Sequence, residues 1–361
     1  MEKERVSRMI DLSKVDIHQM VVHKVGNKSR DEGVRISQTR YEVPSEEVRD
    51  TLLKYFLTSF KFDMFYRFHH ETDLSMNEVY TYASRMFDQP NTFHEQSVHI
   101  LNHLYEQSSH PQIKSGELYV VHLNNILYND FSIDAIGLFK SENKDVYLKL
   151  DEPNMDDLGL LIEEGVNVRK LDKGCLILNV KAVGGFVVGV VDATAGKTQD
   201  AAMYWMEDFL NVTFMEDENY YTDHAIQMVN EFYDNVIAPA SEQPEKKEKL
   251  EFINSTMEYF SRTDKFEEEE FIHNVLQDHN QGEMFKVYKE SYTEMNELPP
   301  FDAMPISQTA LKKAKKTLRN VIKTDTGVEL KLKSESFPYV ERGYDEERKL
   351  HYYKVYFSQE E

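Results

Sequence analysis

The sequence predicts an α+β protein, in which an N-terminal antiparallel sheet with flanking helices is followed by a mostly helical C-terminal region ending in a small β-sheet. Short runs rich in β-branched and aromatic residues recur between residues 117 and 192 and are separated by polar turns, which is typical of antiparallel strands. From residue 222 to residue 323 the apolar residues mostly have the spacing of helices. A chain of 361 residues is longer than one hydrophobic core usually organises, so we expect two domains.

The first predicted elements are a hairpin and a helix. Residues 15–27 and 33–43 have the pattern of two strands joined by a polar loop that contains glycine. Ser45 then stands in front of a helical pattern and has the side chain of an N-cap. One face of that helix carries the apolar residues Val48, Leu52, Leu53, Phe56, Leu57 and Phe60.

Two further helices and a series of strands complete the predicted N-terminal region. Residues 77–87 and 93–107 predict helices, and Thr92 and Glu95 have the spacing of a capping box for the second. The strand-like runs that follow are residues 117–129, 132–140, 145–150, 174–180 and 186–192. We expect these strands to form one antiparallel sheet, interrupted by a loop at residues 151–157.

The remaining chain predicts helices, a linker and a small terminal sheet. Residues 238–249 combine proline, serine and mixed charges, which favours a linker, and we place the domain boundary there, giving domains 1–239 and 240–361. The acidic residues 267–270 follow Thr263 and suit the first turns of a helix, where the helix dipole favours them. The other predicted elements are helices over 198–212 and 222–237, mostly helical chain to residue 296, a helix over 307–323 and a small sheet over 327–357.

Composition excludes several classes of protein. With 64 acidic and 42 basic residues the formal charge is -22, so the surface as a whole repels DNA phosphates and anionic membranes, and any nucleic-acid contact must be local. The single cysteine, Cys175, lies in an apolar run and predicts a buried thiol in a reducing compartment. The longest apolar run, residues 183–191, is too short to span a bilayer, so we expect a cytoplasmic protein without a membrane partner.

A possible nucleotide site ends in Gly196-Lys197-Thr198, between a strand pattern and a helix pattern. The phosphate-binding loop requires a glycine five residues before Gly196, and that position holds Val191, a β-branched residue unsuited to positive φ. We favour a polar turn in which Thr198 caps the following helix, with Lys197 as no more than a candidate anion contact. A nucleotide-binding enzyme that uses this turn is therefore a distant alternative.

The histidines do not predict a metal site. His94 and His99 are five residues apart and diverge on a helix, while His99 and His103 have suitable spacing but no evident third ligand. No catalytic motif such as G-x-S-x-G or C-x-x-C occurs. We therefore predict no metal, no cofactor and no catalytic residues.

The basic feature of this acidic chain is the segment 307–323, which carries six basic residues and no acidic one. If the segment is one helix, its charged stripe lies beside an apolar stripe that docks on the core. In the last predicted strand Lys354 shares a face with Tyr352 and Tyr356, a mixture that could stack bases. The alternative is a solvated helix and an edge strand protected by lysine. The candidate nucleic-acid contacts are Lys312, Lys316, Arg319, Lys323 and Lys354.

Three parts of the chain resemble one known family. These parts are residues 15–26 (VDIHQMVVHKVG), the strand-rich middle and residues 190–212 (VVDATAGKTQDAAMYWMEDFLNV), and they are similar to bacterial nucleoid-associated proteins of the NdpA type. Members of that family have an early Ile-His-Gln segment and an aromatic-rich helix that ends in Phe-Leu, here Trp205, Met206, Asp208, Phe209 and Leu210. The resemblance, which is weaker in the C-terminal third, implies a cytoplasmic, nucleoid-associated, DNA-binding protein and brings no catalytic residues.

Two hypotheses about function remain open. The chain is either a non-enzymatic nucleoid-associated protein that binds DNA weakly through a local basic surface, or an acidic interaction module that docks on a basic DNA-bound protein. The sequence does not indicate the oligomeric state. In either hypothesis residues 205, 209 and 210 are predicted to share a buried helix face.

Overall fold

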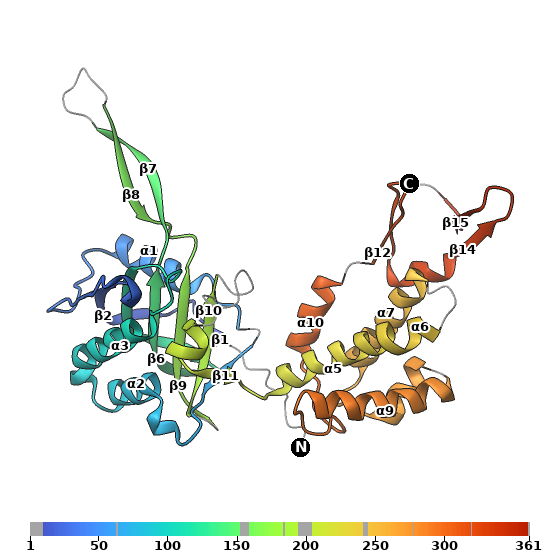
Figure 1. Ribbon diagram of the computed structural model, residues 1–361, viewed down its shortest axis with the longest axis horizontal. Helices are drawn as coiled ribbons and strands as arrows, with labels where there is room; N and C mark the ends of the chain where they lie inside the picture. The colour runs from blue at the N-terminus through green and yellow to red at the C-terminus, as the bar shows by residue number, and fades with distance from the viewer. Residues whose placement is uncertain are drawn as a thin grey trace. The chain divides into compact units, whose positions relative to one another are not determined.

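The computed structural model describes residues 10–62, 64–151, 159–182, 185–193, 204–240, 245–276, 278–318 and 320–359. The chain divides into two compact units, Met1–Met215 and Glu216–Glu361, and each is described by itself (Figure 1). The first unit is an antiparallel sheet with helices, and the second consists of helices followed by small β-hairpins, which confirms the predicted α+β class. A domain boundary at residues 239 and 240 would assign helix α5 (Glu218–Phe232) to the first unit, whereas its contacts group it with the second.

The first unit is built on a nine-stranded antiparallel sheet with the order β11-β4-β10-β9-β6-β5-β2-β3, and β1 pairs with β5 beside this path. Its strands are β1 (Ile10–Asp11), β2 (Asp16–Val25), β3 (Val34–Arg35), β4 (Tyr66–Phe68), β5 (Gly116–Tyr128), β6 (Phe131–Ser141), β9 (Lys173–Ala182), β10 (Gly185–Asp192) and β11 (Val212–Phe214). The predicted opening hairpin is present as β2 and β3. Its second strand is much shorter than predicted, because the amide of Ser37 donates to the His23 ring instead of a backbone carbonyl.

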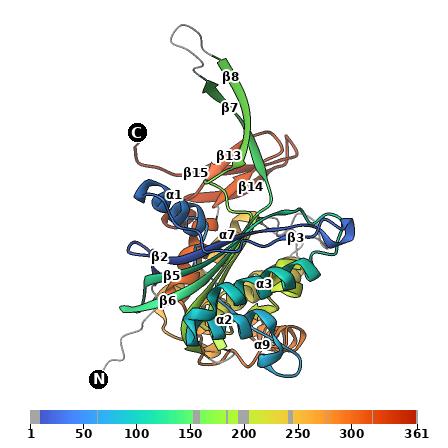
Figure 2. The same cartoon turned by 90° about the vertical axis from the view of Figure 1, so that its left-hand side faces the viewer.

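Both faces of this sheet are buried, which explains why its central strands are apolar without strict alternation. One face packs against α2 (Glu78–Asp88) and α3 (Phe93–Gln107), and the other packs against α1 (Glu46–Leu57) (Figure 2). Successive residues of β5 and β9 alternate between the two cores: Val120 and Ile177 face the first, while Val121 and Leu178 face the second. The short 3-10 helices of this unit are Lys28–Arg30, Leu74–Met76 and Pro90–Thr92.

The two predicted helix caps differ in outcome. The Ser45 side chain accepts a hydrogen bond from the amide of Val48 and caps α1, as predicted. Thr92 does not cap α3, so the predicted capping box is wrong. Thr92 is the last residue of a 3-10 turn and has helical backbone angles, and its hydroxyl donates to the carbonyl of Gln89.

Strands β7 (Lys144–Asp151) and β8 (Gly159–Val166) form a separate two-stranded sheet. This hairpin projects beyond the nine-stranded sheet from which it arises (Figure 1). The prediction of one sheet is therefore wrong for residues 145–150, which pair only with β8 among the described strands.

The second unit is a helical bundle with aromatic residues at its centre, including Phe232, Phe260, Phe266, Phe271 and Phe285. Its helices are α5, the π-helical turn Tyr233–Ile237, α6 (Ala238–Ala240), α7 (Lys246–Arg262), α8 (Glu268–Phe271), the π-helical turn Ile272–Leu276, α9 (His279–Met295) and α10 (Gln308–Thr317). Two hairpins follow, β12 (Val321–Lys323) with β13 (Glu329–Lys331), and β14 (Val340–Asp345) with β15 (Leu350–Val355), separated by the 3-10 helix Ser334–Tyr339. The predicted small terminal sheet is thus two separate hairpins.

The predicted helix over residues 307–323 begins as expected and ends early. Ser307 caps α10 by accepting from the amide of Ala310, but the helix stops at Thr317 and Leu318 has an extended backbone. The β-branched pair Val321 and Ile322 then belongs to a strand. Ile322 is buried there with Leu250 and Phe337, away from the core that α10 contacts, which explains why the helix does not continue.

Candidate nucleic-acid interface

Helix α10 carries four lysines in two environments. Lys313 pairs with Asp223 at 3.7 Å, and the Lys315 ammonium donates to the hydroxyl of Ser261. Lys312 and Lys316 are both exposed, and no ion-pair partner is found for either among the residues that the structure describes. At a spacing of four residues they lie on the same face of the helix, so two uncompensated charges point to solvent together.

The other two candidate residues that the structure describes, Lys323 and Lys354, do not continue this face. Arg319 lies outside the described residues. Lys323 lies on β12 and pairs with Glu329 at 2.6 Å, so its charge is compensated. Lys354 lies on β15 in a different hairpin. The predicted helical stripe of Lys312, Lys316, Arg319 and Lys323 is therefore wrong for Lys323, because α10 ends at Thr317 and Lys323 belongs to a strand.

The terminal hairpin does place aromatic and basic side chains together. Tyr352, Lys354 and Tyr356 alternate along the chain, and the Lys354 ammonium lies 4.7 Å from the centre of the Tyr356 ring. Tyr352 is 49% exposed and lies opposite Gly343, where a side chain would collide with its ring. The Tyr356 hydroxyl donates to Glu341, however, which adds a carboxylate to this surface.

The acidic segment 267–270 begins helix α8, as predicted from its sequence. Glu268 contacts Lys289 at 2.5 Å, and Glu269 contacts Lys286 at 2.9 Å. Lys289 is nearly buried and also contacts Asp302 at 2.9 Å, so Glu268 belongs to an internal network. Two of the four acids thus have lysine partners within the second unit.

The turn Gly196-Lys197-Thr198 and the start of the helix predicted after it lie outside the described residues. Val191 belongs to β10, where it pairs with Gly174 in a regular antiparallel register. Gly189 lies in the same strand, and a side chain there would approach the Phe62 ring to 3.1 Å. Close packing in a strand accounts for this glycine.

The histidines considered as metal ligands make separate contacts. His94 Nε2 lies 2.8 Å from the carbonyl oxygen of Ser37, and His103 Nε2 lies 3.0 Å from that of Phe209. His99 Nδ1 lies 3.5 Å from the side-chain oxygen of Gln96. Among the described residues no cluster of three or more metal-ligating side chains occurs.

The segments that carry the family resemblance are packed parts of the first unit. Ile17, His18 and Gln19 lie in β2, where Gln19 contacts the buried His122 ring at 3.3 Å. In the described part of the later segment, Tyr204–Phe209 forms a π-helical turn. Trp205, Phe209 and Leu210 are 0, 1 and 0% exposed, which confirms their predicted burial.

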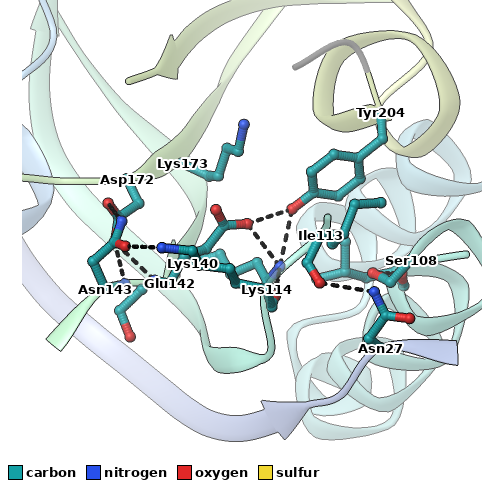
Figure 3. Close-up of polar contacts among 12 residues, drawn as sticks. Asn27, Ser108, Ile113, Lys114, Lys140, Glu142, Asn143, Asp172, Lys173 and Tyr204 are labelled. Carbon is teal, nitrogen blue, oxygen red and sulfur yellow. Dashed lines mark hydrogen bonds and ion pairs between the residues drawn. The ribbon is translucent and has the colours of Figure 1, made fainter. Parts of the chain in front are cut away.

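A buried polar network next to this turn was not predicted from the sequence (Figure 3). The Lys140 ammonium donates to the carbonyl of Lys114 at 2.7 Å, to Glu142 at 2.8 Å and to the Tyr204 hydroxyl at 2.9 Å. Burial lowers the pKa of Lys140, while the adjacent Glu142 carboxylate raises it. Burial and then the Glu142 charge raise the pKa of Tyr204 well above its usual value. All three ammonium protons have partners, so this lysine is arranged to anchor Tyr204.

The network also compensates two like charges that lie side by side in the sheet. Lys140 of β6 and Lys173 of β9 are cross-strand neighbours, and both are almost completely buried. Each has a carboxylate, because Lys173 contacts both oxygens of Asp192 at 2.6 Å while Lys140 contacts Glu142. A lysine inside an apolar strand is the sequence signal for such a network, but its partners are distant in sequence and could not be inferred.

The structure thus describes an α+β protein of two units, with two exposed lysines on helix α10 of the second unit. A family model described as Nucleoid-associated protein YejK matches residues 21–349, and the chain therefore belongs to this family of nucleoid-associated proteins. The match confirms the resemblance and extends it through α10 into the C-terminal hairpins. No curated protein matches the chain. Among the described residues, no helix is long and apolar enough to cross a membrane.

Proposed function

We propose that this chain is a non-enzymatic nucleoid-associated protein of the cytoplasm that binds DNA weakly through its C-terminal region. Lys312 and Lys316 of α10 are the central contacts in this proposal, with Arg319, Lys323 and Lys354 as further phosphate contacts. The observation that carries it is the pair of exposed lysines without an ion-pair partner in the described residues of a family member. Lysines used in this way neutralise phosphates and release counterions.

The formal charge of -22 limits the strength of this binding. A few lysines must hold a polyanion against the repulsion of the remaining surface, so the contact is local and sensitive to salt. Lys323 must break its ion pair with Glu329 before it can contact DNA, so it is a weaker phosphate contact than Lys312.

A second candidate is favoured by the same charge: the chain reaches the nucleoid by docking on a basic DNA-bound protein. In the segment 267–270, Glu268 and Glu269 already have lysine partners, so Glu267 and Glu270 are the acids that this docking would use. This candidate predicts nucleoid association without direct DNA binding.

The first test replaces Lys312 and Lys316 by glutamine and measures DNA binding by fluorescence anisotropy at several salt concentrations. Binding should weaken equally for unrelated duplexes, and the slope of log K against log salt should become shallower by about 1.8, or about 0.9 per phosphate contact. The control is Lys54→Gln/Lys61→Gln, which makes the same change of charge at exposed positions of the first unit. If both variants weaken binding equally, the loss comes from the change of net charge, and Lys312 and Lys316 are not specific DNA contacts.

Charge reversal distinguishes the second candidate. If docking on a basic protein is the route to the nucleoid, Glu267→Lys/Glu270→Lys should release the protein from the nucleoid fraction of lysed cells, and Lys312→Gln/Lys316→Gln should not. Direct DNA binding predicts the reverse pattern. If the purified wild-type protein fails to bind duplex DNA even at about 50 mM salt, direct binding through α10 is wrong.

A further inference from the structure

The β7–β8 hairpin presents an apolar face to solvent. Alternate residues of its strands put Val146, Leu148, Leu150, Leu160 and Ile162 on one side, and we call these five residues the arm face. They are 66, 66, 63, 66 and 73% exposed. Leu148 lies opposite Ile162 and Leu150 opposite Leu160, so the apolar side chains form one continuous patch, which ends where Val146 lies opposite Glu164.

On the opposite side of the hairpin, polar side chains pair with one another. The Tyr147 hydroxyl donates to Glu163 at 2.9 Å, and the Lys149 ammonium donates to the same carboxylate at 3.1 Å. Near the base, the Asn167 amide donates to Asp145. A two-stranded hairpin with one polar and one exposed apolar face is marginally stable alone, and contiguous exposed apolar patches mark interaction sites.

DNA does not fit this surface, although a two-stranded ribbon has the width to enter a groove. The described strands of the hairpin carry four carboxylates and two lysines, and one of these lysines already contacts Glu163. A groove would place these carboxylates beside phosphates, and five aliphatic side chains offer no charge to hold it. The occupant of the arm face must be apolar protein surface.

The charges along the hairpin indicate a second copy of this chain, laid in the opposite direction. At the base, the three exposed cations Lys144, Arg169 and Lys170 outnumber the two exposed carboxylates, Asp145 and Glu164, and only Lys144 of the three has an ion-pair partner, Glu117, among the described residues. At the far end β7 finishes at Asp151, and the connecting sequence 152–158 adds three acids and no basic residue. Two antiparallel arms therefore bring the acidic end of each toward the basic base of the other.

We propose that two copies of this chain associate by packing arm face on arm face around a twofold axis that passes near Leu148 and Ile162. The contact is isologous, because the same patch serves on both copies, and it has the geometry of two sheets packed face to face. This association goes beyond the proposed DNA contact and does not depend on it.

The size of the arm face predicts a reversible dimer. Five aliphatic side chains about two-thirds exposed supply on the order of 300 Å² of apolar area per copy, if a whole side chain supplies roughly 100 Å². Stable interfaces bury about 800 Å² per partner. The dimer should therefore dissociate on dilution, and its population should rise with concentration.

The first experiment measures the mass of the full-length protein by sedimentation velocity between low and high micromolar concentrations. The wild type should move from monomer to twice the monomer mass, and Leu148→Thr/Ile162→Thr should raise the dissociation constant about a hundredfold. The control variant, Tyr147→Thr/Leu161→Thr, changes the same strands on the opposite face and should dimerise as the wild type does. Circular dichroism establishes that each variant is folded.

Cross-linking then tests the geometry. Because Cys175 is buried, an introduced cysteine is the accessible thiol of the variant. Ile162→Cys near the proposed axis should form a disulfide-linked dimer under mild oxidation, whereas Lys149→Cys on the opposite face should not. A wild type that stays monomeric throughout, equal loss in both double variants, or efficient cross-linking through Lys149→Cys would each overturn the proposal, the last by indicating a different pairing of the arms.

Discussion

His23 is a buried ring whose two nitrogens both have partners. Its Nε2 lies 3.0 Å from the Ser97 hydroxyl, and its Nδ1 accepts from the amide of Ser37 at 3.2 Å, so the ring is held neutral. Burial, followed by the nearby His94, lowers the pKa of His23 from 6.5 to about 4. The unfolded chain takes up a proton below about pH 6.5, but the folded chain does so only near its lowered pKa.

The free energy of unfolding should therefore fall as the pH falls from 6.5 toward 4, and His23 should account for about 2 kcal/mol of the fall at pH 5. Urea denaturation of wild type and His23→Gln at pH 7.5 and pH 5 measures this share as the difference between their pH-dependent losses. His351→Gln, an exposed histidine, is the control and should behave as the wild type. An undiminished acid loss in His23→Gln would assign the effect to other groups.

At the scale of the element, the π-helical turn Tyr204–Phe209 is a structural part of the first core. The Trp205 and Phe209 rings lie 4.8 Å apart, and the Trp205 indole donates to the carbonyl of Gly174 at 3.3 Å. Trp205→Ala should lower the free energy of unfolding by about 3 to 5 kcal/mol, because it leaves a cavity in a closely packed site. The comparison is Phe131→Ala, whose ring is 74% exposed. Thermal melting measures the effect. If Trp205→Ala keeps the melting temperature of the wild type but loses DNA binding, the turn is a binding surface and not a structural part of the core.

The same scale shows what local pattern can and cannot predict. Helices α1, α2 and α3 follow from their apolar periodicity, since each buries the face that its sequence marks, and strands β5, β6 and β9 follow from their runs of β-branched and aromatic residues. The end of α10 does not follow, because Leu318 has the spacing of a helix and the chain leaves the helix only to bury Ile322 beside Phe337. The sequence also does not predict that β7 and β8 form a sheet of their own. Leu148 and Leu150 have the pattern of sheet-core residues, and only their exposure in the structure shows that they are not.

For the same reason, the sequence predicts only part of the candidate site. Lys312 and Lys316 could be identified because both lie within one helix. The pairing of Lys323 with Glu329 and the three partners of Lys140 depend on contacts between separate elements, which periodicity does not encode.

For the whole molecule, the strong excess of negative charge predicts how DNA binding depends on salt. With between two and five phosphate contacts, log K against log salt should have a slope of about -1.8 to -4.5, so raising salt from about 50 to about 200 mM should weaken binding about ten- to five-hundredfold. A titration of the wild-type protein by fluorescence anisotropy gives the slope directly. A slope steeper than about -6 would require a larger basic surface than α10 and the terminal hairpins supply.

The edge of the nine-stranded sheet has a consequence for how the protein is made. Strand β4 takes Tyr66–Phe68 from early in the chain, and β11 pairs with it through Val212–Phe214, at the end of the first unit. A chain growing on the ribosome cannot complete this sheet before residue 214 has emerged. Strand β4 therefore remains without its partner β11 while β5 to β10 are synthesised. The lysines of α10 are translated later still. During synthesis, the sheet has therefore received all of its strands before the proposed DNA contacts exist.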